Sequence, residues 1–199
     1  MSCLFEGTPP QRAEGIKTRG KRQDKDALPE QKHVRPLEDS GKHFEDFRVG
    51  AKLKGKVGRT ITESDNIWFT LLTNNSNQIH FNTDYAKKYF PGEPFKGRTV
   101  VNGFLTLGLV AGLLVDETSA NGFMLGIEAV KFLKPVFPGD TIYAGCDVKE
   151  ARDSSGHLGF GIVKIDSWGT NQDGERVIEF ARSFMVRKRR IVWNKKRRA

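Results

Sequence analysis

The first hydrophobic pattern along the chain predicts a helix that begins near residue 62. Its apolar positions recur three and four residues apart, as on one face of a helix: Ile67, Trp68, Leu71 and Leu72. Thr62 can cap this helix, and Asp65 completes a capping-box-like pair with it. The periodicity stops at Thr73, and the small or amide side chains of residues 74–78 favour a turn. The pattern therefore predicts a capped helix followed by a polar loop.

A second helical stretch, residues 103–115, is apolar at nearly every position and follows Asn102, a suitable cap residue. A helix that is apolar on all sides is expected to be buried on all sides. Gly108 and Gly112 lie four residues apart and give this helix one thin face, which another backbone can approach closely. Between the two helical stretches, residues 83–90 predict a short helix that ends at a Pro-Gly pair.

The pattern changes to that of strands after residue 121. The clearest alternation puts four apolar side chains on one face of a strand: Ile142, Ala144, Cys146 and Val148. Strands are predicted over residues 52–61, 123–133, 141–149, 158–168 and 176–186, and residues 171–174 are a hairpin signal. Strands joined by short turns predict an antiparallel meander, which together with the buried helix indicates an α+β fold.

The composition separates a central domain, residues 43–188, from two terminal segments. Residues 1–42 are rich in Gly, Pro, Gln and charged side chains, which predicts a flexible extension. The net charge is +9, but residues 186–199 carry eight basic and no acidic side chains, so the rest of the chain is nearly neutral. We interpret residues 189–199 as a basic tail. Such a run is more often a solvated end than a nucleic-acid site, so no nucleic-acid partner is expected.

The cysteines and the apolar runs indicate where the protein works. Cys3 and Cys146 provide neither a disulfide framework nor the spacing of a metal site, which fits a reducing cytoplasm. The first thirty residues lack the apolar core of a secretory signal. The longest apolar run, residues 104–115, is too short to span a bilayer. We therefore expect a cytoplasmic protein with no membrane partner and no bound metal.

His80 is the best-framed candidate for chemistry. It follows the polar loop and lies between Ile79 and Phe81, an arrangement that can hold an imidazole at the wall of a pocket and tune its protonation. A histidine between apolar neighbours is also common as a packed side chain with one hydrogen bond. The pattern alone leaves both interpretations open.

Four segments of the chain resemble the MaoC-like dehydratases, a family with the hotdog fold. They lie in the family order and together cover residues 44–187: FEDFRVGAKL, TITESDNIWFTLLTNNSNQIHFNTDYA, TVVNGFLTLGLVAGLL and FLKPVFPGDTIYAGCDV. The resemblance implies a single hotdog domain, in which a curved antiparallel sheet wraps around a buried central helix. Within the family, the long polar loop and the last strand look most similar to the branch of mesaconyl-CoA hydratases, also called β-methylmalyl-CoA dehydratases.

The resemblance implies an enoyl-CoA hydratase or dehydratase in which His80 is the acid/base group. The backbone amide of Gly103 would stabilise the thioester oxygen as negative charge develops. The (R)-specific hydratases of the family carry an aspartate five residues before the histidine, where this chain has Asn75. An amide cannot take a proton, but it can orient the water by hydrogen bonds. Gly108 stands where these hydratases have a helix serine, so that contact is absent here.

The resemblance also implies the remaining partners. No cofactor is expected, because coenzyme A is part of the acyl-CoA substrate. Basic residues at the mouth of the site suit its phosphates, and the candidates are Lys96, Arg98 and Lys134. Asn77 and Asn102 complete the predicted substrate-binding set, although each can equally serve only as a turn former or a helix cap. Hotdog domains usually close their exposed sheet edges on a second copy, so we expect a homodimer or a higher homo-oligomer.

Four activities are compatible with these residues. Hydration of mesaconyl-CoA, or dehydration of β-methylmalyl-CoA, follows from the most similar branch. An (R)-specific enoyl-CoA hydratase for short straight chains would use the same chemistry. A hotdog thioesterase usually needs an Asp or Glu to activate water, and the loop before His80 offers only amides. The last alternative is a non-catalytic acyl-CoA-binding or protein-binding domain, in which Asn75 marks a lost active site.

Overall fold

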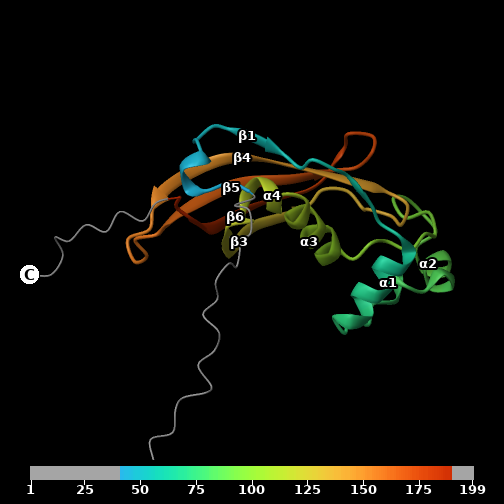
Figure 1. Cartoon of the computed structure of the whole chain (residues 1–199). Coiled ribbons are helices and arrows are strands. Elements are labelled where there is room, and N and C mark those ends of the chain that lie inside the picture. Colours follow the sequence, from blue (N-terminus) through green and yellow to red (C-terminus); the bar gives the residue numbers. More distant parts are fainter. Residues whose placement is uncertain (1–40, 190–199) are drawn as a thin grey trace, which may run out of the picture. The chain divides into compact units, whose positions relative to one another are not determined.

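The computed structural model describes residues 41–189, so most of the predicted extension and of the basic tail lies outside the described residues. An antiparallel sheet runs in the order β1-β4-β5-β6-β3, and the helices α3 (Gly103–Leu113) and α4 (Val115–Thr118) lie against one of its faces (Figure 1). The strands are β1 (Lys52–Lys54), β2 (Arg59–Thr60), β3 (Gly122–Phe132), β4 (Thr141–Asp153), β5 (Phe160–Thr170) and β6 (Arg176–Arg187). None of the helices in this part of the chain has the length and apolar character needed to cross a membrane.

The sheet contains the predicted meander but is larger than a meander. β4, β5 and β6 are consecutive antiparallel neighbours, whereas β3 pairs with β6 at one edge and β1 pairs with β4 at the other. The prediction of one strand over residues 52–61 is wrong, because β1 and β2 are separate short strands that both pair with β4. Gly55 and Gly58 lie at this break. A Cβ atom at Gly58 would collide with the Tyr143 ring, so the chain leaves the sheet where only glycine fits.

The core forms between the inner face of the sheet and one face of α3 (Gly103–Leu113). The predicted alternation of β4 is confirmed, since its four inward side chains are buried: Ile142, Ala144, Cys146 and Val148. Val110 of α3 packs closely on β5, where a Cβ atom at Gly169 would lie 2.5 Å from its methyl group. Burial raises the pKa of the Cys146 thiol to about 11, so this side chain behaves as a small apolar residue.

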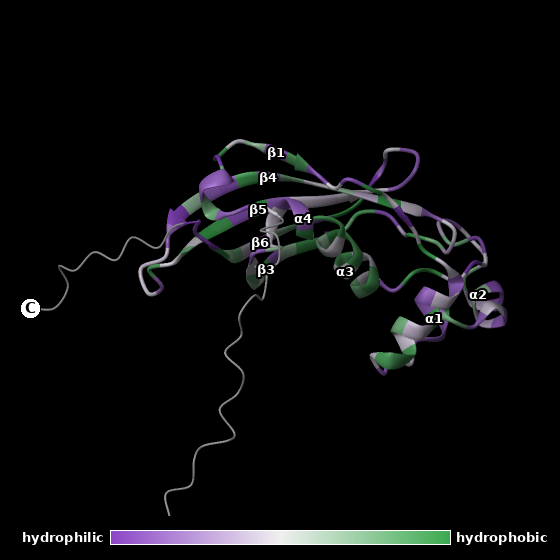
Figure 2. Cartoon of the chain, in the orientation of Figure 1, coloured by the Kyte–Doolittle hydropathy of each residue, from purple (hydrophilic) through white to green (hydrophobic). Residues whose placement is uncertain are grey.

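The prediction that the apolar helix is buried on all sides is wrong for the described chain. Val110 and Ala111 pack on the sheet, whereas Phe104, Gly108 and Gly112 form a stripe on the opposite side of α3. Phe104 is 70% exposed, and Figure 2 shows α3 as a hydrophobic ribbon on that side of the sheet. A sheet covers only one side of a helix, and no other element of residues 41–189 covers this stripe. α4 (Val115–Thr118) follows directly.

Helix α1 (Glu63–Leu72) confirms the predicted cap, but its buried face is polar. The Thr62 hydroxyl accepts the Asp65 N–H at 3.1 Å, and the Asp65 carboxylate accepts the Thr62 N–H at 2.9 Å. These hydrogen bonds from Thr62 hold the pKa of Asp65 below its usual value. The buried residues are Asn66 and Thr70. Three of the predicted apolar positions are instead exposed: Trp68, Leu71 and Leu72.

Ion pairs fasten the residues that follow β6 to the short helix η1 (Phe44–Asp46) and to the end of β4. The Arg189 guanidinium donates to both carboxylate oxygens of Asp46, at 2.8 and 2.7 Å, and thereby lowers the pKa of that carboxyl. Lys188 Nζ lies 2.7 Å from Asp153 Oδ1. The first residues of the basic run are therefore anchored to the domain.

Candidate active site

The segment between α1 and α2 (Thr83–Tyr89) brings His80 beside the residues that precede α3. Asn77 Oδ1 accepts the N–H of Ile79 at 3.3 Å, which starts the single turn η2 (Gln78–His80). Ile79 is buried, and its carbonyl accepts the N–H of Val100 at 3.1 Å. The turn and the segment before α3 are thus joined through their backbones, and the imidazole faces that segment.

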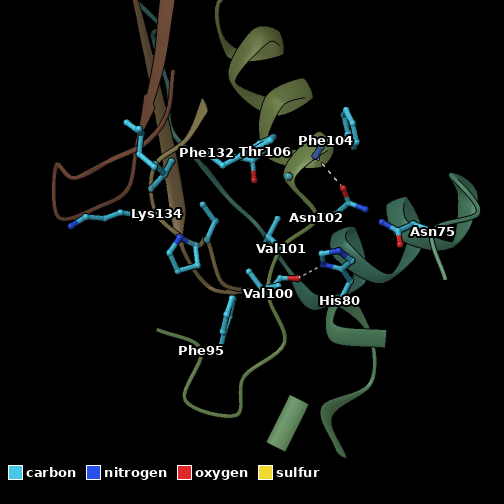
Figure 3. A pocket seen from close by; sticks show the side chains of 15 residues that line it. Asn75, His80, Phe95, Val100, Val101, Asn102, Phe104, Thr106, Phe132 and Lys134 are labelled. Carbon is cyan, nitrogen blue, oxygen red and sulfur yellow. Dashed lines mark hydrogen bonds between the residues drawn. The ribbon is translucent and has the colours of Figure 1, made fainter. Parts of the chain in front are cut away.

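The imidazole of His80 is fixed by a main-chain carbonyl. Its Nδ1 lies 2.9 Å from the Val100 carbonyl oxygen (Figure 3). A carbonyl oxygen can only accept, so Nδ1 is the donor and carries the proton. In the neutral ring Nε2 is then unprotonated and available as a base. The half-buried position of His80 keeps this nitrogen accessible to a ligand.

A cavity of about 470 Å³ opens in front of His80. Most of its wall is apolar and comes from the segment before α3, from α3 itself, from the end of β3 with the residues that follow it, and from β6: Phe95, Val100, Val101, Phe104, Phe132, Leu133, Val136 and Val177. Its polar side chains are few: Asn75, His80, Asn102, Thr106 and Lys134. An apolar wall with a small number of convergent polar groups is typical of a small-molecule site.

Asn75 presents a donor to this cavity. Its Oδ1 accepts the backbone N–H of Asn77 at 2.9 Å, which fixes the orientation of the amide. Within residues 41–189 its Nδ2 has no hydrogen-bond acceptor. An amide nitrogen in this position can donate to a water or hydroxyl oxygen, but it cannot remove a proton.

The N-terminus of α3 also faces the cavity. Asn102 caps the helix, as predicted, because its Oδ1 accepts the N–H of Phe104 at 3.0 Å (Figure 3). Gly103 lines the cavity, and within residues 41–189 its amide has no acceptor. A Cβ atom at Gly103 would lie 2.8 Å from the Phe132 ring, so glycine allows the ring to close over this amide. An unpaired N–H at a helix N-terminus favours developing negative charge.

The structure separates the predicted basic residues. Lys134 lines the cavity, and its amino group donates to Glu175. Lys96 and Arg98 line a different groove of about 270 Å³, which Thr99 and Pro138 also line. Lys96 Nζ pairs with a neighbouring glutamate at 2.8 Å, and the Arg98 guanidinium stacks over a phenylalanine ring at 4.1 Å. Of the three candidates, only Lys134 thus shares the cavity with His80.

The other predicted residues divide in the same way. His80, Asn75, Gly103 and Asn102 line one cavity, whereas Asn77 is exposed and braces the loop through its bond to Ile79. Within the described part of the chain, no group of three or more His, Cys, Asp or Glu side chains is arranged to hold a metal ion.

Two polar residues of the site were missed by the sequence interpretation. Thr106, the one hydroxyl residue of α3, is 2% exposed and lines the cavity. Asn66 is 1% exposed and touches the backbone around His80 and Asn102. The available signal was a polar residue inside an apolar helical pattern, and for Asn66 a second polar residue, Thr70, four positions later.

The family model of the MaoC-like domain matches residues 45–165. The chain belongs to the MaoC-like domain family. Two relatives of this MaoC-like chain are a mesaconyl-CoA hydratase from Cereibacter sphaeroides and a β-methylmalyl-CoA dehydratase from Chloroflexus aurantiacus. The first is 31% identical over 153 residues and covers 76% of this chain and 43% of its own. The second is 33% identical over 150 residues, with coverages of 75% and 41%. The MaoC-like chain thus spans less than half the length of these relatives.

Solved structures agree with the fold of the MaoC-like chain. A MaoC domain protein dehydratase from Chloroflexus aurantiacus superposes with a TM-score of 0.68 at 32% identity, over 75% of this chain and 41% of that one. A Mycobacterium tuberculosis protein described as a double hotdog has a TM-score of 0.65 at 16% identity, over 74% of this chain and 44% of that one, which speaks for the fold alone. The predicted hotdog domain and the predicted resemblance are confirmed.

Proposed function

We propose that the protein is a hydro-lyase that adds or removes water across the double bond of an enoyl-CoA, with mesaconyl-CoA as the unsaturated substrate. The observation that carries this proposal is the single cavity shared by His80, Asn75 and Gly103. Hydration of an enoyl thioester needs a base for the water, a group that holds the water, and a donor for the enolate oxygen. The names of two relatives support the choice of substrate.

The proposed hydration uses one residue as both base and acid. His80 Nε2 takes a proton from a water molecule whose oxygen accepts a hydrogen bond from Asn75 Nδ2. That oxygen bonds to Cβ of the substrate, and the electrons of the double bond move onto the thioester oxygen, beside the Gly103 N–H. The imidazolium then returns a proton to Cα, which regenerates the thioester and neutral His80. The reverse sequence eliminates water.

The alternatives have less support. Among the described residues that line the cavity none is a carboxylate, which leaves a thioesterase without the acidic residue that it usually needs. A non-catalytic acyl-CoA-binding domain has no use for a cavity histidine whose Nδ1–H is held by a carbonyl and whose Nε2 is left unprotonated. An (R)-specific hydratase of straight chains would use the same residues, so only substrate preference separates it from the proposal.

Substrate preference is the first test. We expect the protein to hydrate mesaconyl-CoA with a kcat/KM about tenfold or more above that for crotonyl-CoA, followed as loss of enoyl-thioester absorbance. The reason is Lys134, the cation among the described cavity residues, which can pair with the distal carboxylate. Lys134→Met should then remove the preference, whereas Lys131→Met, at a lysine also paired with a glutamate but outside the cavity, should keep it.

Each other outcome of this assay is informative. A preference for crotonyl-CoA would keep the hydratase chemistry and contradict the dicarboxylate substrate. If Lys134→Met lowered kcat/KM equally for mesaconyl-CoA and crotonyl-CoA, that lysine would be assigned to binding the coenzyme A phosphates. Release of free thiol would support a thioesterase, and no turnover of either substrate would support a binding domain.

We further propose that the protein forms a homodimer or a higher homo-oligomer. β3 ends one edge of the sheet and carries exposed apolar side chains: Phe123, Met124, Leu125 and Phe132. An unpaired edge of this kind invites pairing with another chain. The exposed stripe of α3, which is Phe104, Gly108 and Gly112, offers a second apolar surface for the same partner. A second copy could cover both.

The oligomer can be tested at Gly108. A Cβ atom there meets nothing within 4 Å, so Gly108→Leu should leave the protomer folded. The same leucine would hold a second helix away, and we expect it to weaken self-association by about tenfold or more in sedimentation analysis. Gly156→Leu, at an equally open glycine in a surface turn, is the control and should change nothing. A monomeric wild-type protein would contradict the proposal.

A further inference from the structure

We propose that Asn66 is a positioning residue that holds the base and the oxyanion amide of this site as one unit. The inference rests on the proposed function, because it concerns how His80 and Gly103 are kept in register. Asn66 does not line the cavity of about 470 Å³ and so touches no ligand there. Asn66 is 1% exposed, and its amide forms hydrogen bonds with the backbone on both sides of the site.

The contacts of Asn66 use its whole amide group. Nδ2 donates to the carbonyl oxygen of His80 at 2.7 Å and to that of Val100 at 3.0 Å. Oδ1 accepts the backbone N–H of Asn102 at 2.8 Å. Two donors and one acceptor on a single buried side chain thus tie α1 to two other backbone segments, the turn that carries His80 and the segment before α3. A buried amide is costly unless it is bonded in this way, so its presence at a helix position that could be apolar indicates a role.

On the side of the base, Asn66 positions the Val100 carbonyl, and this carbonyl in turn orients the imidazole of His80. The Val100 oxygen accepts from both Asn66 Nδ2 and His80 Nδ1, so these two nitrogen atoms are at most about 6 Å apart. The amide also holds the backbone of His80 itself. Together these bonds set where the ring lies and keep its proton on Nδ1, which leaves Nε2 free. This is how a supporting shell orients a reactive group.

On the side of the oxyanion, Asn66 fixes the start of α3. The amide of Asn102 is occupied by Asn66 Oδ1, so the next amide, that of Gly103, is the first one left for a ligand. Asn102 also reaches back to α1, with its Nδ2 3.3 Å from the Thr70 hydroxyl. The polar face of α1 therefore sets the position of the Gly103 N–H relative to the imidazole. Only an amide side chain can donate to two carbonyls and accept from an N–H at once.

The kinetic test compares Asn66 variants with a control on the same helix. Asn66→Asp keeps the shape and the acceptor but loses both N–H donors, and Asn66→Ala removes all three hydrogen bonds of the side chain. We expect kcat for enoyl-CoA hydration to fall about 100-fold in each while KM stays within about threefold, because the loss is one of alignment. Thr62→Ala removes the exposed cap of α1 and should leave kcat within about threefold. An equal loss of kcat in Thr62→Ala, or an unchanged kcat in both Asn66 variants, would overturn the proposal.

A second measurement needs no substrate and therefore separates this inference from the proposed activity. Long-range ¹H–¹⁵N spectra of labelled protein report which imidazole nitrogen carries the proton, and His80→Gln identifies the His80 signals. We expect neutral His80 to carry its proton on Nδ1 in the wild type, and to be a mixture of the Nδ1–H and Nε2–H tautomers in the Asn66 variants. A wild-type proton on Nε2, or an unchanged tautomer in a folded Asn66 variant, would contradict the positioning role. If the wild-type protein hydrates no enoyl-CoA but the His80 tautomer still changes in the Asn66 variants, only the proposed function is refuted.

Discussion

His80→Gln is expected to lower kcat for enoyl-CoA hydration by about 10³-fold, because a glutamine amide can neither take a proton from water nor return one to the substrate. The loss is expected to be large because no second acid/base group is available to take over. Asn75 offers only an amide, and no carboxylate is found among the described residues of the cavity wall. KM should change by less than about threefold, since the apolar wall that binds the acyl group stays intact.

A histidine elsewhere in the domain provides the control for this variant. His157 lies in the turn before β5, its ring packs 6.4 Å from that of Phe160, and it does not line the cavity. His157→Gln should leave kcat unchanged. Retention of more than about a tenth of the activity in His80→Gln would show that another group is the base. Asn75→Asp adds a carboxylate beside the histidine. A gain of activity in that variant would show that hydration with His80 as the one acid/base group is slower than hydration with a histidine and a carboxylate together.

The parts of the site that the sequence predicted are those set by neighbours in the chain. Thr62 caps α1, Asn102 caps α3, and within the predicted turn the Asn77 N–H donates to Asn75 Oδ1, two positions earlier. Each depends on groups within three positions of one another, which is the range over which a sequence pattern reports directly. The flanking residues singled out His80 in the same way, but they left open whether it is packed or catalytic, and its proposed role came from the family resemblance.

The parts that the sequence missed depend on contacts between distant residues. Asn66 binds the backbone 14 and 36 positions away, and no local pattern reveals that those two segments meet. The same holds for Lys96 and Arg98, which a turn directs into a separate groove although they lie close to the site in sequence. α3 was expected to be buried all round because its composition is apolar, but composition cannot tell which side a sheet covers.

Phe184→Ala is expected to lower the free energy of unfolding by about 4–5 kcal/mol, toward the upper end for loss of a buried aromatic ring. Phe184 is fully buried on β6, and its ring meets that of Phe47 edge-on with centroids 5.7 Å apart. It has a second partner in Arg182, whose guanidinium lies 5.5 Å from the centroid of the ring. Arg182 is 2% exposed and donates to the Thr118 hydroxyl at 2.7 Å, and its burial lowers its pKa. The alanine variant therefore leaves a cavity and also removes an aromatic face from a buried cation.

The two contributions can be separated by urea unfolding at one fixed protein concentration, since self-association would otherwise shift the midpoint. Phe184→Leu keeps most of the volume but not the π face, and should cost about 1–2 kcal/mol. Leu158→Ala, at a leucine that is 59% exposed in a turn, should cost less than about 0.5 kcal/mol. In an Arg182→Met background, the loss in free energy of unfolding caused by Phe184→Ala should be smaller by about 1–2 kcal/mol, because that background has no guanidinium to interact with the Phe184 ring. An identical cost in both backgrounds would mean that the ring stabilises the core by packing alone, with no contribution from Arg182.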